Sequence, residues 1–286
     1  MEKEYLIHER PMKALLIFSL PMMIGNLFQQ FYTMADSIVV GRFVSERALA
    51  AVGASYSLTT VFISIAIGGG IGASVIVSQA FGARDYAKMR LTVHTALVSF
   101  LALSILLGIF GFAAGESIMK LLNTPADILD QAAEYLRIYF LGLPFLFMYN
   151  VLSSMFNALG RSRIPLYLLI FSSLFNILLD IYFVYILHLG VAGVAWATFI
   201  AQGISAGLSF FIFLKELRAY QSEKTSWFSA SAFVSMTRIA LPSILQQSTV
   251  SIGMMLVQSV VNSFGAQMLA GYSAAMRIES LCVVPM

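Results

Sequence analysis

Long apolar runs separated by short charged segments are the feature that most constrains this chain. A helix needs about 20 mostly apolar residues to cross the hydrocarbon core of a bilayer. The sequence predicts seven such spans and the start of an eighth near residue 269, at 14–41, 51–80, 91–113, 131–158, 164–187, 191–214 and 236–263. The expected fold is therefore an all-α polytopic membrane protein.

Composition points the same way. Hydrophobic residues make up 59% of the chain, charged residues 11%, and the mean hydropathy is +0.85. Soluble domains average about 45–50% apolar and about 25% charged residues. The basic residues form short clusters between apolar spans, so the partners we expect are the lipid bilayer and small molecules rather than nucleic acid. Cys282 is the only cysteine, and no cofactor is expected.

The distribution of Lys and Arg predicts the orientation. If the N-terminus lies in the cytoplasm, the outer segments hold Arg42, Arg47 and Lys120. The inner segments then hold Lys3, Arg10, Lys13, Arg84, Lys88, Arg90, Arg161, Arg163, Lys215, Arg218, Lys224 and Arg238. Cytoplasmic loops are the ones enriched in these residues. We therefore expect a cytoplasmic N-terminus and a location in a cell membrane, the bacterial inner membrane.

An internal repeat suggests two lobes. Leu20-Pro21 opens the first span, and Leu241-Pro242 opens the seventh, 221 residues later. The copies are an even number of spans apart, so they share one orientation, as in parallel-repeat transporters. We predict a six-helix first lobe over 1–217, an inner linker over 218–235 and the start of a second lobe over 236–286. The chain ends within the eighth apolar segment, which we interpret as truncation.

Asp36 and Asp180 each lie inside an apolar span. An acidic side chain at the centre of a membrane helix costs roughly 2.5–3.5 kcal/mol on insertion scales, so such residues usually mark ion or substrate pathways. Counting from the helix ends places both aspartates at a similar depth in the outer half of the membrane, together with Thr198 on the next span. Asn176 precedes Asp180 by four residues on the same helical face. The sequence thus predicts an ion-coupling site at Asp36, Asn176, Asp180 and Thr198.

Two ions suit such a site. Two carboxyl groups in one low-dielectric pocket suit proton uptake and release, whereas carboxylate, amide and hydroxyl oxygens from the same four residues are also suitable ligands for Na⁺. We favour H⁺. Asn150, Gln29 and Gln30 are further candidates for lining the cavity. For Asn176 and Thr198 alone, a purely structural hydrogen bond between helices is about equally plausible. Near the outer end of the fourth span, Glu134 and Arg137 are expected to form a local pair.

Six stretches together resemble one known family. They are residues 20–41, 48–53, 79–83, 157–160, 176–180 and 190–202, which include Leu20-Pro21, Asp36-Ser37, Asn157-Ala158-Leu159-Gly160 and Gly190-Val191-Ala192-Gly193. The pattern is similar to that of the MATE (multidrug and toxic compound extrusion) transporters. The resemblance implies two six-helix bundles and export of cationic, amphiphilic compounds in exchange for H⁺ or Na⁺. It also implies an ion site at Asp36, Asn176, Asp180 and Thr198. Residues 243–263 contain no acidic residue, a departure that favours the DinF-like branch.

Two other functions stay open at this point. A flippase for lipids or polysaccharide precursors would share a related fold, but few Lys or Arg residues fall in the middle of a span to bind an anionic headgroup. An intramembrane enzyme is a remote alternative, because Ser74 does not lie in a Gly-x-Ser-x-Gly elbow and no histidine lies at a suitable depth.

Overall fold

The computed structural model describes residues 10–122, 124–220 and 226–262, and all statements about structure refer to these residues. Within them the chain is helical, and no strand is present. The elements are α2 (Pro11–Phe43), α3 (Glu46–Gly82), α4 (Tyr86–Leu121), α5 (Ala126–Leu141), α6 (Leu143–Ala158), α7 (Arg163–Ile181), the π-helix η1 (Tyr182–Ile186), α8 (Gly190–Arg218) and α9 (Ala230–Asn262). The all-α fold is as predicted.

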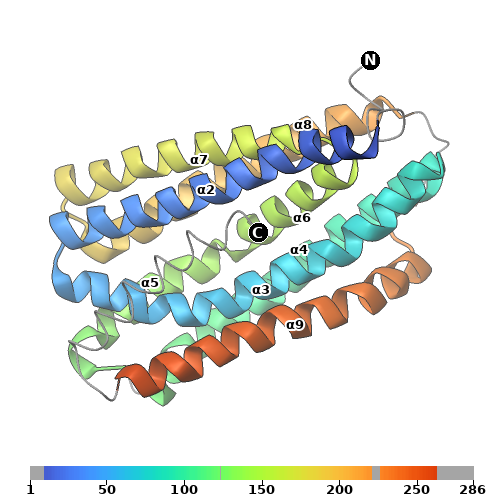
Figure 1. Cartoon of the computed structure of the whole chain (residues 1–286). Coiled ribbons are helices and arrows are strands. Elements are labelled where there is room, and N and C mark those ends of the chain that lie inside the picture. The colour runs from blue at the N-terminus through green and yellow to red at the C-terminus, as the bar shows by residue number, and fades with distance from the viewer. Residues whose placement is uncertain (1–9, 123, 221–225, 263–286) are drawn as a thin grey trace.

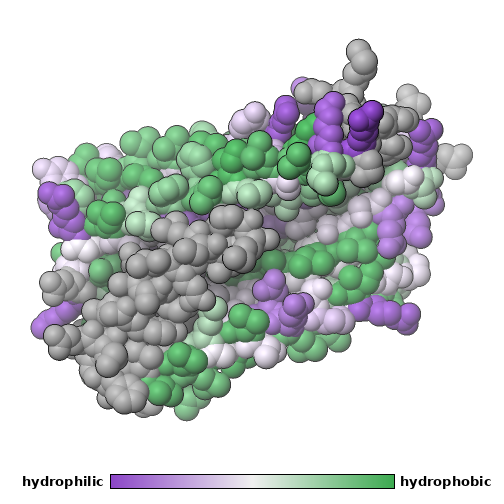
Figure 2. Space-filling model, in the orientation of Figure 1, coloured by the Kyte–Doolittle hydropathy of each residue, from purple (hydrophilic) through white to green (hydrophobic). Residues whose placement is uncertain are grey.

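The helices have the length and hydropathy of membrane spans. Among the described residues five segments meet both criteria, and the pair α5 and α6, bent by 53° at its junction, makes a sixth if it is counted as one span. Helix α9, with 33 residues, covers the predicted seventh span. Hydrophilic residues gather mainly at the two ends of the helices, with a largely hydrophobic surface between them (Figure 2). The protein is therefore a multi-pass membrane protein. The predicted eighth span lies outside the described residues.

The helices form two groups joined by a bent pair. Helix α7 contacts both α2 and α8, while α3 contacts both α4 and α9 (Figure 1). Helices α5 and α6 lie between the groups, because each contacts α3, α4 and α8. In this arrangement α7 lies between α2 and α8, and α8 in turn lies against α5.

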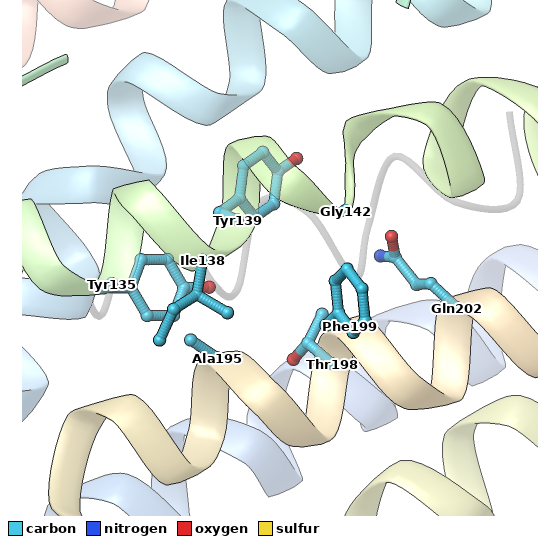
Figure 3. A pocket seen from close by; sticks show the side chains of 8 residues that line it. All are labelled: Tyr135, Ile138, Tyr139, Gly142, Ala195, Thr198, Phe199 and Gln202. Carbon is cyan, nitrogen blue, oxygen red and sulfur yellow. The ribbon is translucent and has the colours of Figure 1, made fainter. Parts of the chain in front are cut away.

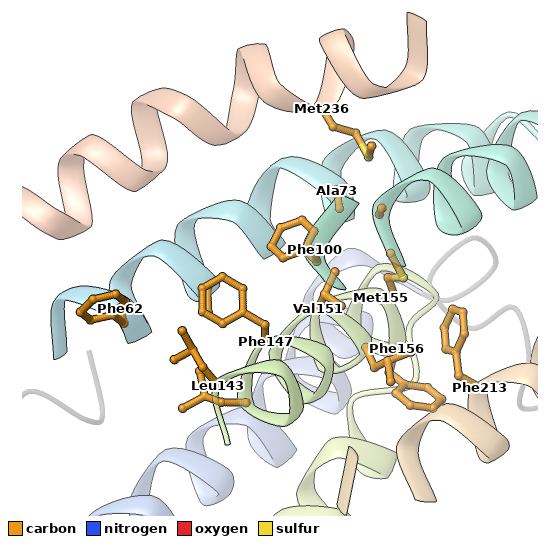
Figure 4. Packing of buried hydrophobic residues seen from close by; sticks show 14 of the residues in the cluster. Phe62, Ala73, Phe100, Leu143, Phe147, Val151, Met155, Phe156, Phe213 and Met236 are labelled. Atoms are coloured by element: carbon orange, nitrogen blue, oxygen red, sulfur yellow. The ribbon is translucent and has the colours of Figure 1, made fainter. Parts of the chain in front are cut away.

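Aromatic side chains fill the interior between these groups. Phe140, Phe147, Phe156 and Phe213 are almost completely buried. The rings of Phe62 and Phe140 meet edge to face with centroids 4.9 Å apart. The ring of Phe100 lies against that of Phe147 (Figure 4). Lipid tails are as apolar as these side chains, so close van der Waals packing stabilises the arrangement more than exclusion of water does.

The predicted fourth span, 131–158, is not one continuous helix. Helix α5 ends at Leu141 and helix α6 begins at Leu143, with Gly142 between them. Pro144 has no N–H to donate to the carbonyl of Phe140, and its ring obstructs the preceding turn. Gly142 also suits a close approach, since a Cβ there would lie 3.2 Å from Cδ2 of Phe199. The sequence analysis predicted one span here, and the structure corrects this to two helices joined at Gly142.

The predicted fifth span, 164–187, also changes its helical type. The α-helix ends at Ile181, and Tyr182–Ile186 forms a π-helical turn in which the N–H of Leu187 donates to the carbonyl of Tyr182 over 3.1 Å. Single π-helical turns inside helices are frequent at functional sites. This turn begins two residues after Asp180.

Helix α9 begins earlier than the predicted boundary at 236. Its first residue is Ala230, because Ser229 acts as an N-cap whose Oγ accepts the N–H of Ala232 at 3.4 Å. The N–H of Ser229 in turn donates to Oγ1 of Thr95 on α4 at 3.1 Å. The predicted linker over 218–235 therefore overlaps the first residues of this helix, and the division into two lobes stays a prediction.

Helix α9 packs very closely against α3. A Cβ on Gly72 would lie 2.7 Å from both the backbone N of Ala240 and the backbone O of Met236. Farther along the same contact, the hydroxyl groups of Ser64 and Ser251 are 2.7 Å apart and hydrogen-bonded. Small residues at such positions let two helix backbones approach within a membrane.

Polar contacts tie the helix ends together. At the predicted inner end, Arg161 donates to Oε1 of Glu216 through Nε (3.1 Å) and Nη2 (2.9 Å), which joins the α6–α7 connection to α8. At the opposite end, Glu116 accepts hydrogen bonds from Lys120 (2.8 Å) and Arg137 (3.0 Å). The predicted local pair of Glu134 and Arg137 was wrong, since Arg137 reaches across to α4 instead.

Candidate ion-coupling site

Three helices carry the four predicted site residues. Asp36 lies on α2, Asn176 and Asp180 lie one turn apart on α7, and Thr198 lies on α8. Asn176 is 2% exposed and Asp180 is 0% exposed. Because α7 contacts both α2 and α8, the fold brings the four side chains into one polar cluster inside an apolar bundle.

Asn176 is the centre of this cluster. Its amide orientation follows from its hydrogen-bonding neighbours. The amide nitrogen donates to Oδ2 of Asp180 and to the hydroxyl oxygen of Tyr32, each at 3.0 Å, and the amide oxygen accepts the backbone N–H of Thr198 at 3.1 Å. The reversed orientation leaves only a marginal contact of 3.5 Å with Oγ1 of Thr198. One amide therefore links α2, α7 and α8.

The carboxyl groups of Asp36 and Asp180 are hydrogen-bonding neighbours. A carboxylate only accepts hydrogen bonds, so two carboxyl groups bond to each other only when one of them carries a proton. The Oδ1 atom of each is buried and has no hydrogen-bond partner among the described residues. The pair can thus hold a proton between the two groups, and it keeps two buried oxygens free for a further contact.

Two tyrosines belong to the cluster but were not predicted from the sequence. Tyr32 contacts Asn176 and is also a hydrogen-bonding neighbour of Thr198. Tyr135 on α5 interacts electrostatically with both carboxyl groups. Tyr32 precedes Asp36 by four residues, so the same helical-face argument that linked Asn176 to Asp180 could have found it. No comparable signal points to Tyr135.

The other predicted lining residues lie elsewhere. The amide nitrogen of Asn150 on α6 donates to the carbonyl of Leu146 in its own helix at 2.8 Å. Gln29 is exposed and Gln30 is half-buried on α2. In the described part of the chain, no hydrogen bond joins these three side chains to the cluster. Their contribution to a cavity stays a prediction.

A narrow slot adjoins the cluster between α5 and α8 (Figure 3). Thr198 and Tyr135 line it and thus belong to both the slot and the cluster. The cavity volume is ≈ 10 Å³, and its walls are completed by Ile138, Tyr139, Gly142, Ala195, Phe199 and Gln202. Such a volume is near the lower limit for one water molecule.

Over the described ranges, no group of three or more His, Cys, Asp or Glu residues is arranged to hold a metal ion. The oxygens that a cation could use are therefore those of the cluster itself. They come from two carboxyl groups, the hydroxyl groups of Thr198 and Tyr32, and the amide of Asn176, whose oxygen already accepts a backbone hydrogen bond.

The bundle and its inward-facing carboxyl pair define a polytopic membrane protein with an acidic centre, and the sequence assigns its family. The MatE family profile matches residues 21–182, from the proline of α2 to the first residue of the π-helical turn. This match covers more than half of the chain. The chain belongs to the MatE family, which confirms the resemblance noted in the sequence.

Curated relatives agree with this assignment. The chain is 32% identical over 275 residues to the probable multidrug resistance protein YpnP of Bacillus subtilis, covering 96% of this chain and 61% of that protein. It is 26% identical over 268 residues to the multidrug export protein MepA of Staphylococcus haemolyticus, covering 93% of this chain and 59% of that protein. The chain thus spans about three fifths of the length of these relatives.

Solved structures share the fold over the whole chain. A MOP superfamily transporter from Pyrococcus furiosus, described as having a binding pocket of reverse polarity that suggests a different function, superposes with a TM-score of 0.87 at 28% identity. A multidrug resistance MATE family transporter in an outward-facing conformation gives the same values. Each match covers 100% of this chain and 64% of the other.

Proposed function

We propose that the protein carrying this chain is an ion-coupled antiporter that exports cationic, amphiphilic compounds by alternating access. The observation that carries the proposal is the pair of Asp36 and Asp180, in which both Oδ1 atoms are buried and Asp180 is held by Asn176 within a bundle of membrane spans. Ionisable residues inside membrane spans are costly and typically serve ion or substrate pathways. The family membership and the names of the multidrug relatives support the same conclusion.

The arrangement favours H⁺ over Na⁺ as the coupling ion. The NH₂ group of Asn176 faces Asp180 and Tyr32, so it presents donors rather than an oxygen to the centre of the cluster. A bound Na⁺ needs oxygen ligands around it, whereas a proton needs only the two carboxyl oxygens that share it. The Asp36–Asp180 pair offers that geometry without any rearrangement.

The charge pattern supports a cationic substrate. Carboxyl groups lie inside the bundle, while most Lys and Arg side chains of the described helices lie near helix ends. A cavity with this polarity attracts cations and disfavours anionic headgroups. Flipping of anionic lipid or polysaccharide precursors is therefore the weaker alternative.

The mechanism follows from the same pair. A proton that enters from the outside neutralises the pair and removes its attraction for a bound cation, so the cation leaves. Release of the proton toward the inside restores the negative charge and prepares the site for the next cation. Rocking of two lobes, of which α2–α8 form the first, would expose the site to each side in turn.

The test is drug export by cells that express the protein carrying this chain. Asp36→Asn removes the acid but keeps the size of the side chain, so it should abolish proton-driven export of ethidium, a cationic amphiphilic dye. The matched control is Asp85→Asn, at the exposed N-cap of α4, where Asn caps a helix as well as Asp does. Asp85→Asn should export ethidium at the wild-type rate.

Two results would contradict the proposal. Wild-type export by Asp36→Asn would show that the carboxyl pair does not couple ions. Export that depends on a Na⁺ gradient and not on a pH gradient would assign the coupling ion to Na⁺ instead of H⁺.

A further inference from the structure

The slot between α5 and α8 provides a path away from the carboxyl pair. We propose that this slot holds a water molecule that passes protons between the pair and the inner half of the membrane, and that Gln202 positions this water. The inference rests on the proton coupling proposed above. It assigns a second group of residues, beyond the carboxyl pair, to proton transfer.

The slot has the size and the polar groups that a water molecule requires. Its volume of ≈ 10 Å³ admits about one water. A buried water typically makes two to four hydrogen bonds. Thr198, Tyr135 and Gln202 line the space, and each carries a polar group; Figure 3 shows the Gln202 side chain directed across it toward Gly142.

The slot leads inward from the site. Helix α8 starts at Gly190, on the predicted outer side, so Gln202 lies one turn deeper than Thr198 and on the same helical face. The break between α5 and α6 borders the inner part of the slot. A Cβ at Gly142 would lie 3.2 Å from the ring of Phe199, so a side chain at this position would take up space in the slot that glycine leaves free.

Protons can pass from the carboxyl pair to this water through hydroxyl groups. Tyr32 interacts with Asp36 and is a hydrogen-bonding neighbour of Thr198, which lines the slot. As the carboxyl group gives up its proton, each hydroxyl accepts one proton and releases its own, so both hydroxyls end unchanged. The carboxyl group is left as a carboxylate, and the water carries the proton as hydronium until it releases it toward the inside.

Gln202 neither gains nor loses a proton in this step. Its neutral amide offers both a donor and an acceptor to the water, so it is a positioning residue. Removal of the amide should slow proton movement and leave the carboxyl pair intact.

The experiment measures proton flux and dye binding in the same preparations of the protein carrying this chain. Gln202→Met keeps the length of the side chain and removes its hydrogen bonds. In proteoliposomes loaded with the pH indicator pyranine, we expect ethidium-driven proton flux to fall by about tenfold or more. Equilibrium binding of ethidium and its pH dependence should not change. Gln79→Met, at an exposed position on α3, should match the wild type in every measurement.

A second variant separates hydrogen bonding from shape. Gln202→Glu keeps an acceptor and, when protonated, a donor next to the water, so it should restore most of the flux. Equal slowing by Met and Glu would show that hydrogen bonding to the water does not explain the effect of Gln202, and it would overturn the inference.

The outcomes also separate the two proposals. A wild-type flux in Gln202→Met, combined with loss of flux in Asp36→Asn, would overturn this inference alone. Export of ethidium by the wild type without any proton movement would overturn the proposed coupling, and this inference with it.

Discussion

A single buried amide organises the polar centre of this protein. Asn176 uses both amide hydrogens and its oxygen to contact Asp180, Tyr32 and Thr198. A buried polar group that loses its partner costs about 1–3 kcal/mol, so this cluster depends on each of its members. Asn176 therefore stabilises the bundle and also fixes the direction of the carboxyl group of Asp180.

At the scale of the residue, Tyr32→Phe tests this dependence. The substitution removes the acceptor of one Asn176 hydrogen bond and leaves the ring in place. We expect the free energy of unfolding to fall by about 1 kcal/mol. Thermal unfolding of the purified protein measures the effect against Tyr167→Phe, whose side chain is 64% exposed on α7. An equal melting temperature for the two variants would show that the hydroxyl of Tyr32 contributes nothing to stability.

Reasoning from the sequence reached part of this centre. Depth along the spans grouped Asp36, Asn176, Asp180 and Thr198, and the structure places them together, while their function in coupling stays a prediction. Tyr135 was beyond such reasoning, since its position depends on the direction of α5 and hence on the break at Gly142. Spacing along the sequence identifies residues that share one face of a helix. It does not identify a residue on another helix that reaches the same site because that helix is bent.

At the scale of the element, the contact between α3 and α9 depends on glycines of α3, which have no side chain at the contact. A Cβ at Gly72 would lie 2.6 Å from Cβ of Ala240 and 2.7 Å from backbone atoms of α9. Gly68 has the same relation to Ile244, whose Cα would lie 2.7 Å away. These two glycines are one turn apart, so together they define a groove into which α9 fits.

Gly72→Ala should separate these two helices. Backbone atoms cannot move aside as a flexible side chain can, so the substitution should destabilise the protein by about 1–3 kcal/mol. Gly53→Ala is the control. Gly53 also lies on α3, and a Cβ there would meet nothing within 4 Å. Thermal unfolding would contradict this account if Gly72→Ala were as stable as Gly53→Ala.

The sequence predicted the helices better than their ends and bends. Apolar runs located the first three spans and α8 because their hydropathy is continuous. The break between α5 and α6 was not predicted, because the sequence does not show that Gly142 leaves room for Phe199. The start of α9 depends on Ser229 contacting Thr95, a residue 134 positions away. Such long-range contacts decide boundaries that local patterns leave open.

At the scale of the whole molecule, the orientation predicted from Lys and Arg can be tested directly. Single cysteines are introduced at Ala83, in the exposed connection after α3, and at Leu121, 81% exposed at the end of α4, with Cys282 replaced by Ser. If the N-terminus is cytoplasmic, a membrane-impermeant maleimide should label Leu121→Cys on intact cells. It should label Ala83→Cys only after the cells are permeabilised. The opposite pattern would reverse the orientation and the direction of transport.

The whole-molecule comparison confirms the family and the helical architecture, since the solved structures match over the full chain. The two-lobe organisation was inferred from Leu20-Pro21 and Leu241-Pro242. Both prolines lie inside helices, α2 and α9, in the described residues. The DinF-like branch stays a prediction, because the comparisons do not divide the family.

The π-helical turn after Asp180 has a consequence for how such proteins diversify. A π turn holds about one residue more than an α turn, so the chain beyond it is rotated by about 100° relative to an unbroken α-helix. Tyr182–Ile186 therefore changes the direction in which residues of the connection to α8 point, relative to Asp180. A change in the length of this connection would alter the surface at that end of the bundle and leave the direction of the buried acid unchanged.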